Sequence, residues 1–236
     1  LPLGISSFLT QVSIVVIMAV MNNVLVIYGA GSKYGADIPM TVVGIVMKVF
    51  QIVISVVVGI AAGAQPIVGY NYGAGLWRRV KLIFRTMMAA EFSVGLVSLI
   101  CFEVFPVQII SVFGSEDGLY NEFAVLAFRV FLGGIVLCCI QKSCSIFLQS
   151  MGKPALSMLL SLLRDFVLSV PLTLVLPRFF GVTGALYSGP AADVISFGAA
   201  VLCMAAVFRK LNRLEDGEVA LSGASQGGLA VERKIC

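Results

Sequence analysis

Histidine is absent from this sequence of 236 residues, and charged residues make up only 12% of it. The first absence removes imidazole catalysis and the commonest metal ligand. The six cysteines show neither a zinc-binding spacing nor an extracellular disulfide pattern, so we interpret them as small packing residues. Soluble domains carry about a quarter charged residues. The shortage of charge therefore excludes an ordinary soluble domain.

Apolar residues make up 59% of the chain, and they occur in long blocks. A helix needs about 20 mainly apolar residues to cross roughly 30 Å of hydrocarbon. Reading the blocks between glycines, prolines and charges predicts six spans, near residues 5–28, 38–62, 82–105, 124–148, 155–177 and 184–208. The predicted fold is all-α, a polytopic transmembrane helical bundle of six spans.

Positive charges gather after the even-numbered spans. They are Arg78, Arg79, Lys81 and Arg85 after the second, Lys153 after the fourth, and Arg209, Lys210 and Arg213 after the sixth. Clustered Lys and Arg mark cytoplasmic loops, so this pattern predicts cytoplasmic termini in a multi-pass protein of the cell (inner) membrane. It also accounts for the net charge of +4 without a nucleic-acid partner. Residues 1–210 form the predicted lobe, and residues 211–236 a disordered cytoplasmic tail.

Polar residues recur on one stripe of each predicted span. An ionised side chain near mid-bilayer costs about 2.5 to 3.5 kcal/mol on insertion scales, so such residues are expected to face a shared polar interior. The candidates for a substrate or cation pathway are Asn22, Asn23, Lys48, Gln51, Glu91, Gln141, Arg164, Asp165 and Asp193. A structural ion pair of Lys48 or Arg164 with a carboxylate is the alternative. We interpret Arg129 and Lys142, nearer span ends, as snorkelling residues.

Glycine and proline predict where the spans are interrupted. The stretch from Gly63 to Gly75 is expected to be a broken helix end, and Pro171 and Pro190 are expected to kink the fifth and sixth spans. A kink of this kind can be static or can move with a gate, and the sequence leaves both open.

The chain carries a series of short motifs in order, namely Leu1-Pro2 with Asn22-Asn23, Gly44 to Lys48 (GIVMK), Ala64 to Gly75 (AQPIVGYNYGAG), Arg78 to Lys81, Phe147 to Pro154 (FLQSMGKP), Ser161 to Arg164 (SLLR) and Gly189 to Asp193 (GPAAD). Together these motifs resemble the multidrug and toxic compound extrusion (MATE) transporters. The resemblance covers about residues 1 to 210. It implies one lobe of a twelve-helix transporter, namely the C-terminal six helices, whose partner is an N-terminal lobe.

The resemblance further implies efflux of small cationic amphipathic compounds, coupled to a proton or sodium gradient and needing no other cofactor. Lys48, Arg164 and Asp193 match charged family positions, whereas Asp165 stands where an amide is more common. The first and fourth spans lack carboxylates that some sodium-coupled members place there. Our hypothesis is that Asp165, Asp193 or Glu91 contributes to the site of the exchanged cation. Lys48 and Gln51 would adjust how strongly that site binds it.

Three other functions stay open at this point. A lipid-linked oligosaccharide flippase of the same superfamily would need a more cationic cavity than Lys48 and Arg164 provide. An intramembrane enzyme would need a base or a clustered acidic motif, and the sequence has neither histidine nor such a cluster. The third possibility is a half-transporter that is inactive without its N-terminal lobe.

Overall fold

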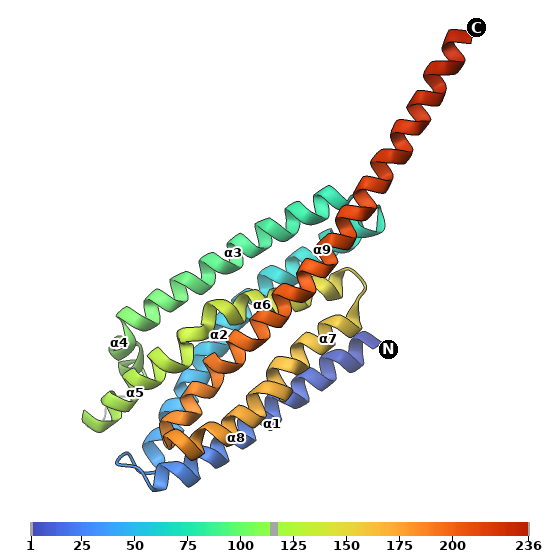
Figure 1. Ribbon diagram of the computed structural model, residues 1–236. Helices are drawn as coiled ribbons and strands as arrows, with labels where there is room; N and C mark the ends of the chain where they lie inside the picture. The colour runs from blue at the N-terminus through green and yellow to red at the C-terminus, as the bar shows by residue number, and fades with distance from the viewer. Residues whose placement is uncertain (1, 114–117, 236) are drawn as a thin grey trace.

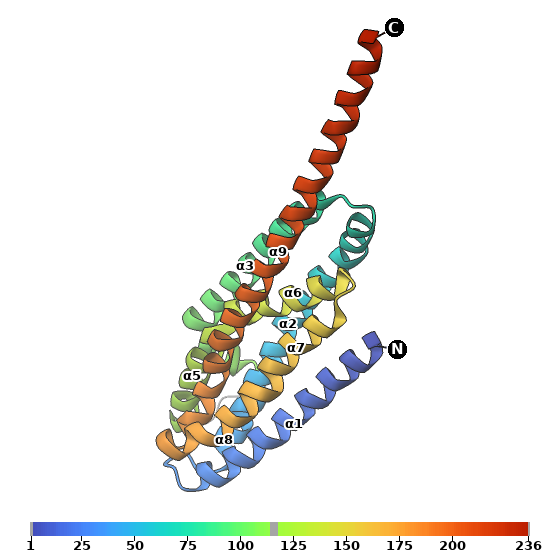
Figure 2. The same cartoon turned by 45° about the vertical axis from the view of Figure 1, so that its right-hand side comes forward.

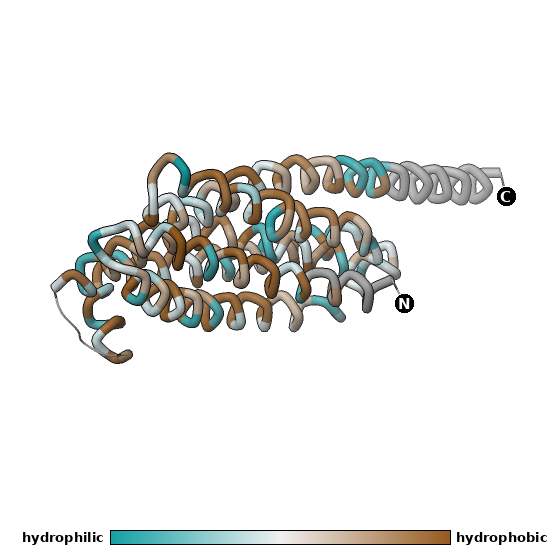
Figure 3. The backbone as a smooth tube through the Cα atoms, turned by 90° about the horizontal axis from the view of Figure 1, so that it is seen from below, coloured by the Kyte–Doolittle hydropathy of each residue, from teal (hydrophilic) through white to brown (hydrophobic). Residues whose placement is uncertain are grey.

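The computed structural model describes the backbone of residues 2–113 and 118–235, and the side chains of Phe8 and of residues 11–113 and 118–216. The secondary-structure elements assigned within the described residues are all helices, joined by short turns, and six segments are long and apolar enough to cross a membrane. The six-span, all-α prediction is confirmed. Figure 1 shows the long helices running side by side, and Figure 3 shows hydrophobic residues along most of the bundle.

The observed elements extend most of the predicted spans at one or both ends. The six spans are α1 (Pro2–Ala30), α2 (Asp37–Gly73), α3 (Trp77–Val104), α5 with α6 (Gly118–Phe131 and Ile135–Ser150), α7 with α8 (Pro154–Leu162 and Ser169–Phe180) and α9 (Val182–Ile235). The fourth and fifth spans are not uniform α-helices. The 3-10 turn η1 (Leu132–Gly134) interrupts the fourth, and the π-helix η2 (Leu163–Leu168) interrupts the fifth. A short helix that was not predicted, α4 (Pro106–Ser111), links α3 to α5.

The second span corrects the prediction of a broken helix end after Gly63. α2 continues through Gly63 and Pro66 and ends only at Gly73. Tertiary packing offsets the local cost of glycine and proline here, because Val68 is fully buried against the neighbouring helices. The side-chain amide of Asn71 also donates to the carbonyl of Ile67 at 2.7 Å. The chain then turns at Gly75, whose φ of 73° favours glycine.

Two hydrophobic clusters hold the bundle together. One contains Leu25, Val46 and Phe128 and joins α1, α2 and α5, and the other contains Phe147 and Leu211 and joins α6 to the far part of α9. Figures 1 and 2 show that α1 and α3 lie on opposite sides of the bundle, with α2, α6 and α9 between them. The central helices therefore have one face toward α1 and another toward α3.

Residues 211–216, which the sequence assigns to the tail, continue α9 and pack against α3. Leu211 is buried, and Glu215 forms ion pairs with Lys81 and, at 3.1 Å, with Arg78. The packed lobe therefore extends at least to Glu215. The backbone of α9 stays helical to Ile235, unlike the disordered tail predicted for residues 211–236, and the side chains beyond Asp216 lie outside the described residues.

An ion pair joins the loop between α1 and α2 to α5. The ammonium of Lys33 lies 2.7 Å from Oε1 of Glu122, and the hydroxyl of Tyr34 donates to the same oxygen at 3.0 Å. The hydrogen bond to Glu122 raises the pKa of Lys33. Both charged side chains are more than half exposed, so we expect this contact to orient the loop more than to stabilise the fold.

Candidate functional site

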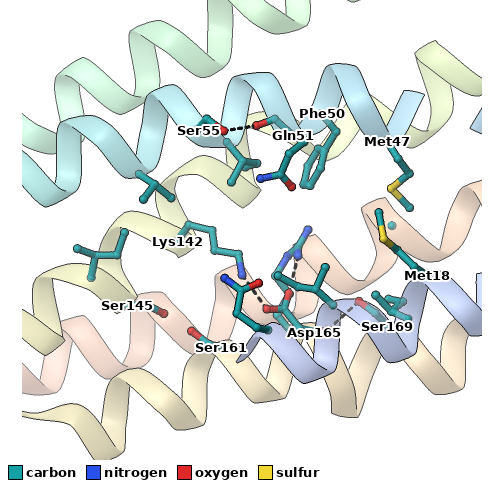
Figure 4. Close-up of a pocket in the computed structure, with 18 of the residues that line it drawn as sticks. Met18, Met47, Phe50, Gln51, Ser55, Lys142, Ser145, Ser161, Asp165 and Ser169 are labelled. Carbon is teal, nitrogen blue, oxygen red and sulfur yellow. Dashed lines mark hydrogen bonds and ion pairs between the residues drawn. The ribbon is translucent and has the colours of Figure 1, made fainter. Parts of the chain in front are cut away.

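A cavity of about 780 Å³ lies against α1, α2, α6 and α7. Figure 4 shows α2 on one side of it and side chains from α1, α6 and η2 on the other. Its apolar wall includes Met18, Met47 and Phe50, and its polar wall includes Gln51 and Ser55. A volume of this size suits a drug-sized molecule, and a mainly apolar lining with a few polar groups is typical of such sites.

Four charged side chains form a continuous network at this wall. The two oxygens of Asp165 are each 2.7 Å from a cation, Oδ1 from Nη1 of Arg164 and Oδ2 from Nζ of Lys142. The guanidinium of Arg164 also binds Oδ1 of Asp193 through Nε at 2.8 Å and Nη2 at 2.7 Å. Two positive and two negative charges therefore balance, and they join α6, η2 and α9.

The cations of this network are nearer the cavity than the carboxylates. The side chains of Lys142 and Arg164 are 15% and 13% exposed, whereas those of Asp165 and Asp193 are each 4% exposed. Lys142, Arg164 and Asp165 line the cavity, and Asp193 is reached only through Arg164. Within the described residues, no group of three or more Cys, Asp or Glu side chains is arranged to hold a metal ion.

The π-helix η2 places Arg164 and Asp165 in the network together. Pro171, one turn further along, has no N–H to offer the carbonyl of Val167, so regular α-helical bonding fails at this point. At the end of η2 the backbone N–H and the hydroxyl of Ser169 both donate to the carbonyl of Arg164, the hydroxyl at 2.7 Å. The irregularity predicted from Pro171 thus takes the form of a π-helical segment, a feature that is frequent at functional sites.

Gly134 allows α9 to approach the network closely. A Cβ atom at this position would lie 2.7 Å from Oδ2 of Asp193 and 3.2 Å from the Cα atom of Pro190. The turn η1 therefore packs against the carboxylate that binds Arg164. The absence of a side chain at position 134 is a steric requirement of the site.

We predict that Gly134→Ala shifts Asp193 away from Arg164 and lowers the melting temperature of the bundle. Gly133→Ala is the matched control, because a Cβ atom at position 133 would meet nothing within 4 Å. The measurement is thermal unfolding of both purified variants in one detergent. Equal melting of the two variants would contradict this role of Gly134.

Three candidate residues predicted to face the interior lie outside the cavity. Lys48, Asn22 and Asn23 are exposed and do not line it. Their sequence neighbours Met47 and Met21 do line the cavity, so Lys48 and Asn22 lie at its depth but on another side of their helices. Spacing groups polar residues on a helix face but does not say which part of that face borders a cavity, and a pathway role for these residues stays a prediction.

Two further candidates are buried away from the cavity. Glu91 on α3 is fully buried beside α6 and is not part of the wall. Gln141 is also fully buried, and its Nε2 donates to the carbonyl of Leu160 at 3.1 Å, which ties α6 to α7. A single polar interior shared by all six spans was therefore the wrong expectation, because α6 separates the face of α3 from the cavity.

The sequence relationship becomes informative once this geometry is known. The MatE family model matches residues 5–175, which is more than half of the chain. The chain belongs to the MatE family. Relatives include the multidrug export protein MepA of Staphylococcus aureus strains NCTC 8325 / PS 47 and COL, each 23% identical over 203 residues. That match covers 85% of this MatE chain and 42% of MepA.

Solved structures share the fold of this MatE protein. The outward-facing conformation of a multidrug resistance MATE family transporter of the MOP superfamily matches with a TM-score of 0.79 at 18% identity, over 89% of this chain and 46% of that one. A MATE structure in complex with MaL6 matches with a TM-score of 0.80 at 18% identity, over 90% and 47%. The MatE chain spans about half the length of the relatives that it matches.

Lys142 is a charged cavity residue of this MatE chain that the sequence interpretation missed. Its position near a span end led us to interpret it as a snorkelling residue, but its ammonium points inward and pairs with Asp165. A signal was present, because Lys142, Ser145 and Gln149 are spaced by three and four residues, and all three line the cavity.

Proposed function

We propose that this chain is the C-terminal lobe of an antiporter that exports cationic amphipathic compounds in exchange for protons or sodium ions. The observation that carries the proposal is the carboxylate of Asp165 in the cavity wall, which holds Lys142 at 2.7 Å. Family membership and the name of the MepA relatives support drug export as the transported class. Membership in a transporter family also favours a transporter over an enzyme.

Lys142 acts in this proposal as a resident cation. Its ammonium is a point charge on a flexible stem, so it can leave Asp165 when a competing cation arrives. An organic cation in the cavity, a sodium ion or a proton on Asp165 would each displace it. Because the site holds one of these positive charges at a time, entry of one favours release of another, and that competition is the basis of exchange.

Arg164 keeps the wall in shape during this exchange. It has a second anionic partner in Asp193 and therefore stays charge-paired when Asp165 changes partners. Its guanidinium also lies 5.9 Å from the centre of the Phe50 ring, on the α2 side of the cavity. Arg164 thus links the two walls, while Lys142 responds to the ligand.

The apolar lining suits substrates of varied shape. Met18, Met47 and Phe50 contribute flexible thioethers and an aromatic ring to the wall. Methionine side chains adapt to irregular surfaces and are common in promiscuous binding sites. A cationic group at Asp165 and an apolar body against these residues describe the amphipathic compounds that we propose as substrates.

The proposed orientation places both termini on the cytoplasmic side of the inner membrane. Arg78, Arg79 and Lys81 lie close to the far part of α9, where Glu215 pairs with Arg78 and Lys81 and where Arg209 and Lys210 also lie. Gathering of positive charge at one end of the bundle supports this orientation. The cavity then opens toward the N-terminal lobe that completes the transporter.

The cavity gives little support to a lipid-linked oligosaccharide flippase. A pyrophosphate headgroup would need uncompensated positive charge, but Lys142 and Arg164 are balanced by Asp165 and Asp193. Lys48, the other cation considered for that role, lies outside the cavity.

We predict that the chain transports only when a second lobe completes the cavity. Two preparations of liposomes would be compared, one with the chain alone and one with the chain and the N-terminal lobe of a MepA relative. Both would be loaded with ethidium, a cationic dye, and then placed in a proton or sodium gradient. Gradient-dependent ethidium movement is expected with both lobes, and the effective gradient identifies the coupling ion. No movement in either preparation, with both proteins folded, would overturn the efflux proposal.

A further inference from the structure

Glu91 is a buried carboxyl group that the proposed exchange site does not use. Its side chain is fully enclosed between α3 and α6, and neither Oε1 nor Oε2 has a hydrogen-bond partner among the described residues. No ion pair within the described part of the chain includes it. An ionised carboxylate in this position would have lost its water without gaining a compensating partner.

The groups that face Glu91 provide no positive charge. The hydroxyl of Ser143 on α6 points toward the carboxyl without reaching hydrogen-bond geometry, and the thiol of Cys139 lies one turn away on the same helix. α2 and α9 also pack against α3, but neither brings a charged side chain to Glu91 within the described residues. A proton is the one cation that needs no further ligands, so it suits a lone carboxyl in this setting.

The protonation state of Glu91 is linked to the packing of α3 against α6. One turn further along α3, a Cβ atom at Gly95 would lie 3.1 Å from the Cα atom of Val136 and 3.6 Å from Sγ of Cys139. α3 and α6 are therefore in close contact beside the carboxyl and leave no space for solvating water. A negative charge here can gain water only if the two helices separate.

We propose that Glu91 is a proton-binding site, separate from the cavity, and that loss of its proton opens the contact between α3 and α6. Lys142 lies on the same helix, next to Ser143 in the chain, so movement of α6 reaches the exchange site. Proton binding at Glu91 itself requires neither a substrate nor the N-terminal lobe. The inference can therefore fail while the efflux proposal stands, and the reverse also holds.

Infrared difference spectroscopy on the purified chain in nanodiscs tests the proton directly. At pH 7 the wild type is expected to show a protonated-carboxyl band that disappears in Glu91→Gln, which keeps the shape of the side chain. Glu103→Gln is the matched control, because Glu103 lies on the same helix but is 45% exposed and pairs with Arg129. That variant is expected to keep the band. Glu91→Met, also neutral and of similar size, replaces Glu91→Gln if the latter does not fold.

Alkylation of Cys139 tests the opening of the helix contact. This thiol is buried at the interface, so a membrane-permeant maleimide reaches it only when α3 and α6 separate. Comparing variants at one pH removes the intrinsic pH dependence of thiol reactivity. We expect labelling several-fold faster in the wild type than in Glu91→Gln at pH 9, and equal rates at pH 6. A folded wild type without the Glu91-dependent band, or with equal labelling rates at pH 9, would overturn the inference.

Discussion

Asp165→Asn is expected to lower ethidium export by about tenfold, because it removes the one carboxylate that can exchange Lys142 for another cation and with it a charge-assisted contact. The substitution keeps the shape of the side chain but removes its charge and replaces one acceptor oxygen with an NH2 donor. Export would be measured in cells that express the chain with an N-terminal lobe, at matched protein levels. Export unchanged by this substitution would eliminate Asp165 as the exchange site.

Loss of stability must be separated from loss of transport in this variant. Removing one partner of a buried ion pair typically costs about 3 to 5 kcal/mol, because the remaining charge is left unpaired. Asp165→Asn leaves Lys142 in that condition, whereas Arg164 still has Asp193. We therefore expect the double variant Asp165→Asn with Lys142→Gln to recover most of the thermal stability in detergent. It should remain deficient in export, and recovery of both properties would mean that the pair is only structural.

Gly184→Ala is expected to destabilise the bundle more than any other single methyl addition considered for this chain. A Cβ atom at position 184 would lie 2.5 Å from the carbonyl oxygen of Leu176, 2.6 Å from its carbonyl carbon and 2.8 Å from the Cα atom of Pro177. These are backbone atoms of α8, so they cannot move aside as a side chain could. We expect a loss of about 3 kcal/mol, at the upper end of typical overpacking costs.

Gly198→Ala is the control for this prediction. It lies on the same helix, α9, but a Cβ atom there would meet nothing within 4 Å. Alanine is the better helix former, so this variant should melt at or slightly above the wild-type temperature. The measurement is thermal unfolding of both purified variants in one detergent. Equal melting of the two variants would show that α8 and α9 are not so closely packed at Gly184.

The six spans could be predicted because hydrophobic length is a local property. Each predicted span overlaps one observed segment, and the backbone of a membrane helix satisfies its own hydrogen bonds whatever surrounds it. The interruptions were harder to place. Pro66 continues α2, whereas Pro171 follows a π-helix, and the difference depends on what packs beside each proline.

The candidate site was predicted only in part. Gln51, Arg164 and Asp165 do line the cavity, and the alternative of a structural pair involving Arg164 and a carboxylate describes a contact that exists. Lys142 was missed, and Glu91 was assigned to a cavity that it does not reach. In each case the helix face could be inferred from spacing, but the neighbouring helix and the depth could not.

By itself, the sequence determined that this protein is an all-helical membrane bundle of six spans and that its spans carry ionisable groups. Both follow from composition and local periodicity, since hydrocarbon requires apolar length and penalises charge. Only the tertiary structure decided that Lys142, Asp165, Arg164 and Asp193 form one balanced network and that Glu91 stands apart from it. Lys142, Asp165 and Asp193 come from three separate segments, and their meeting depends on the rotation and depth of each packed helix, which no local pattern encodes.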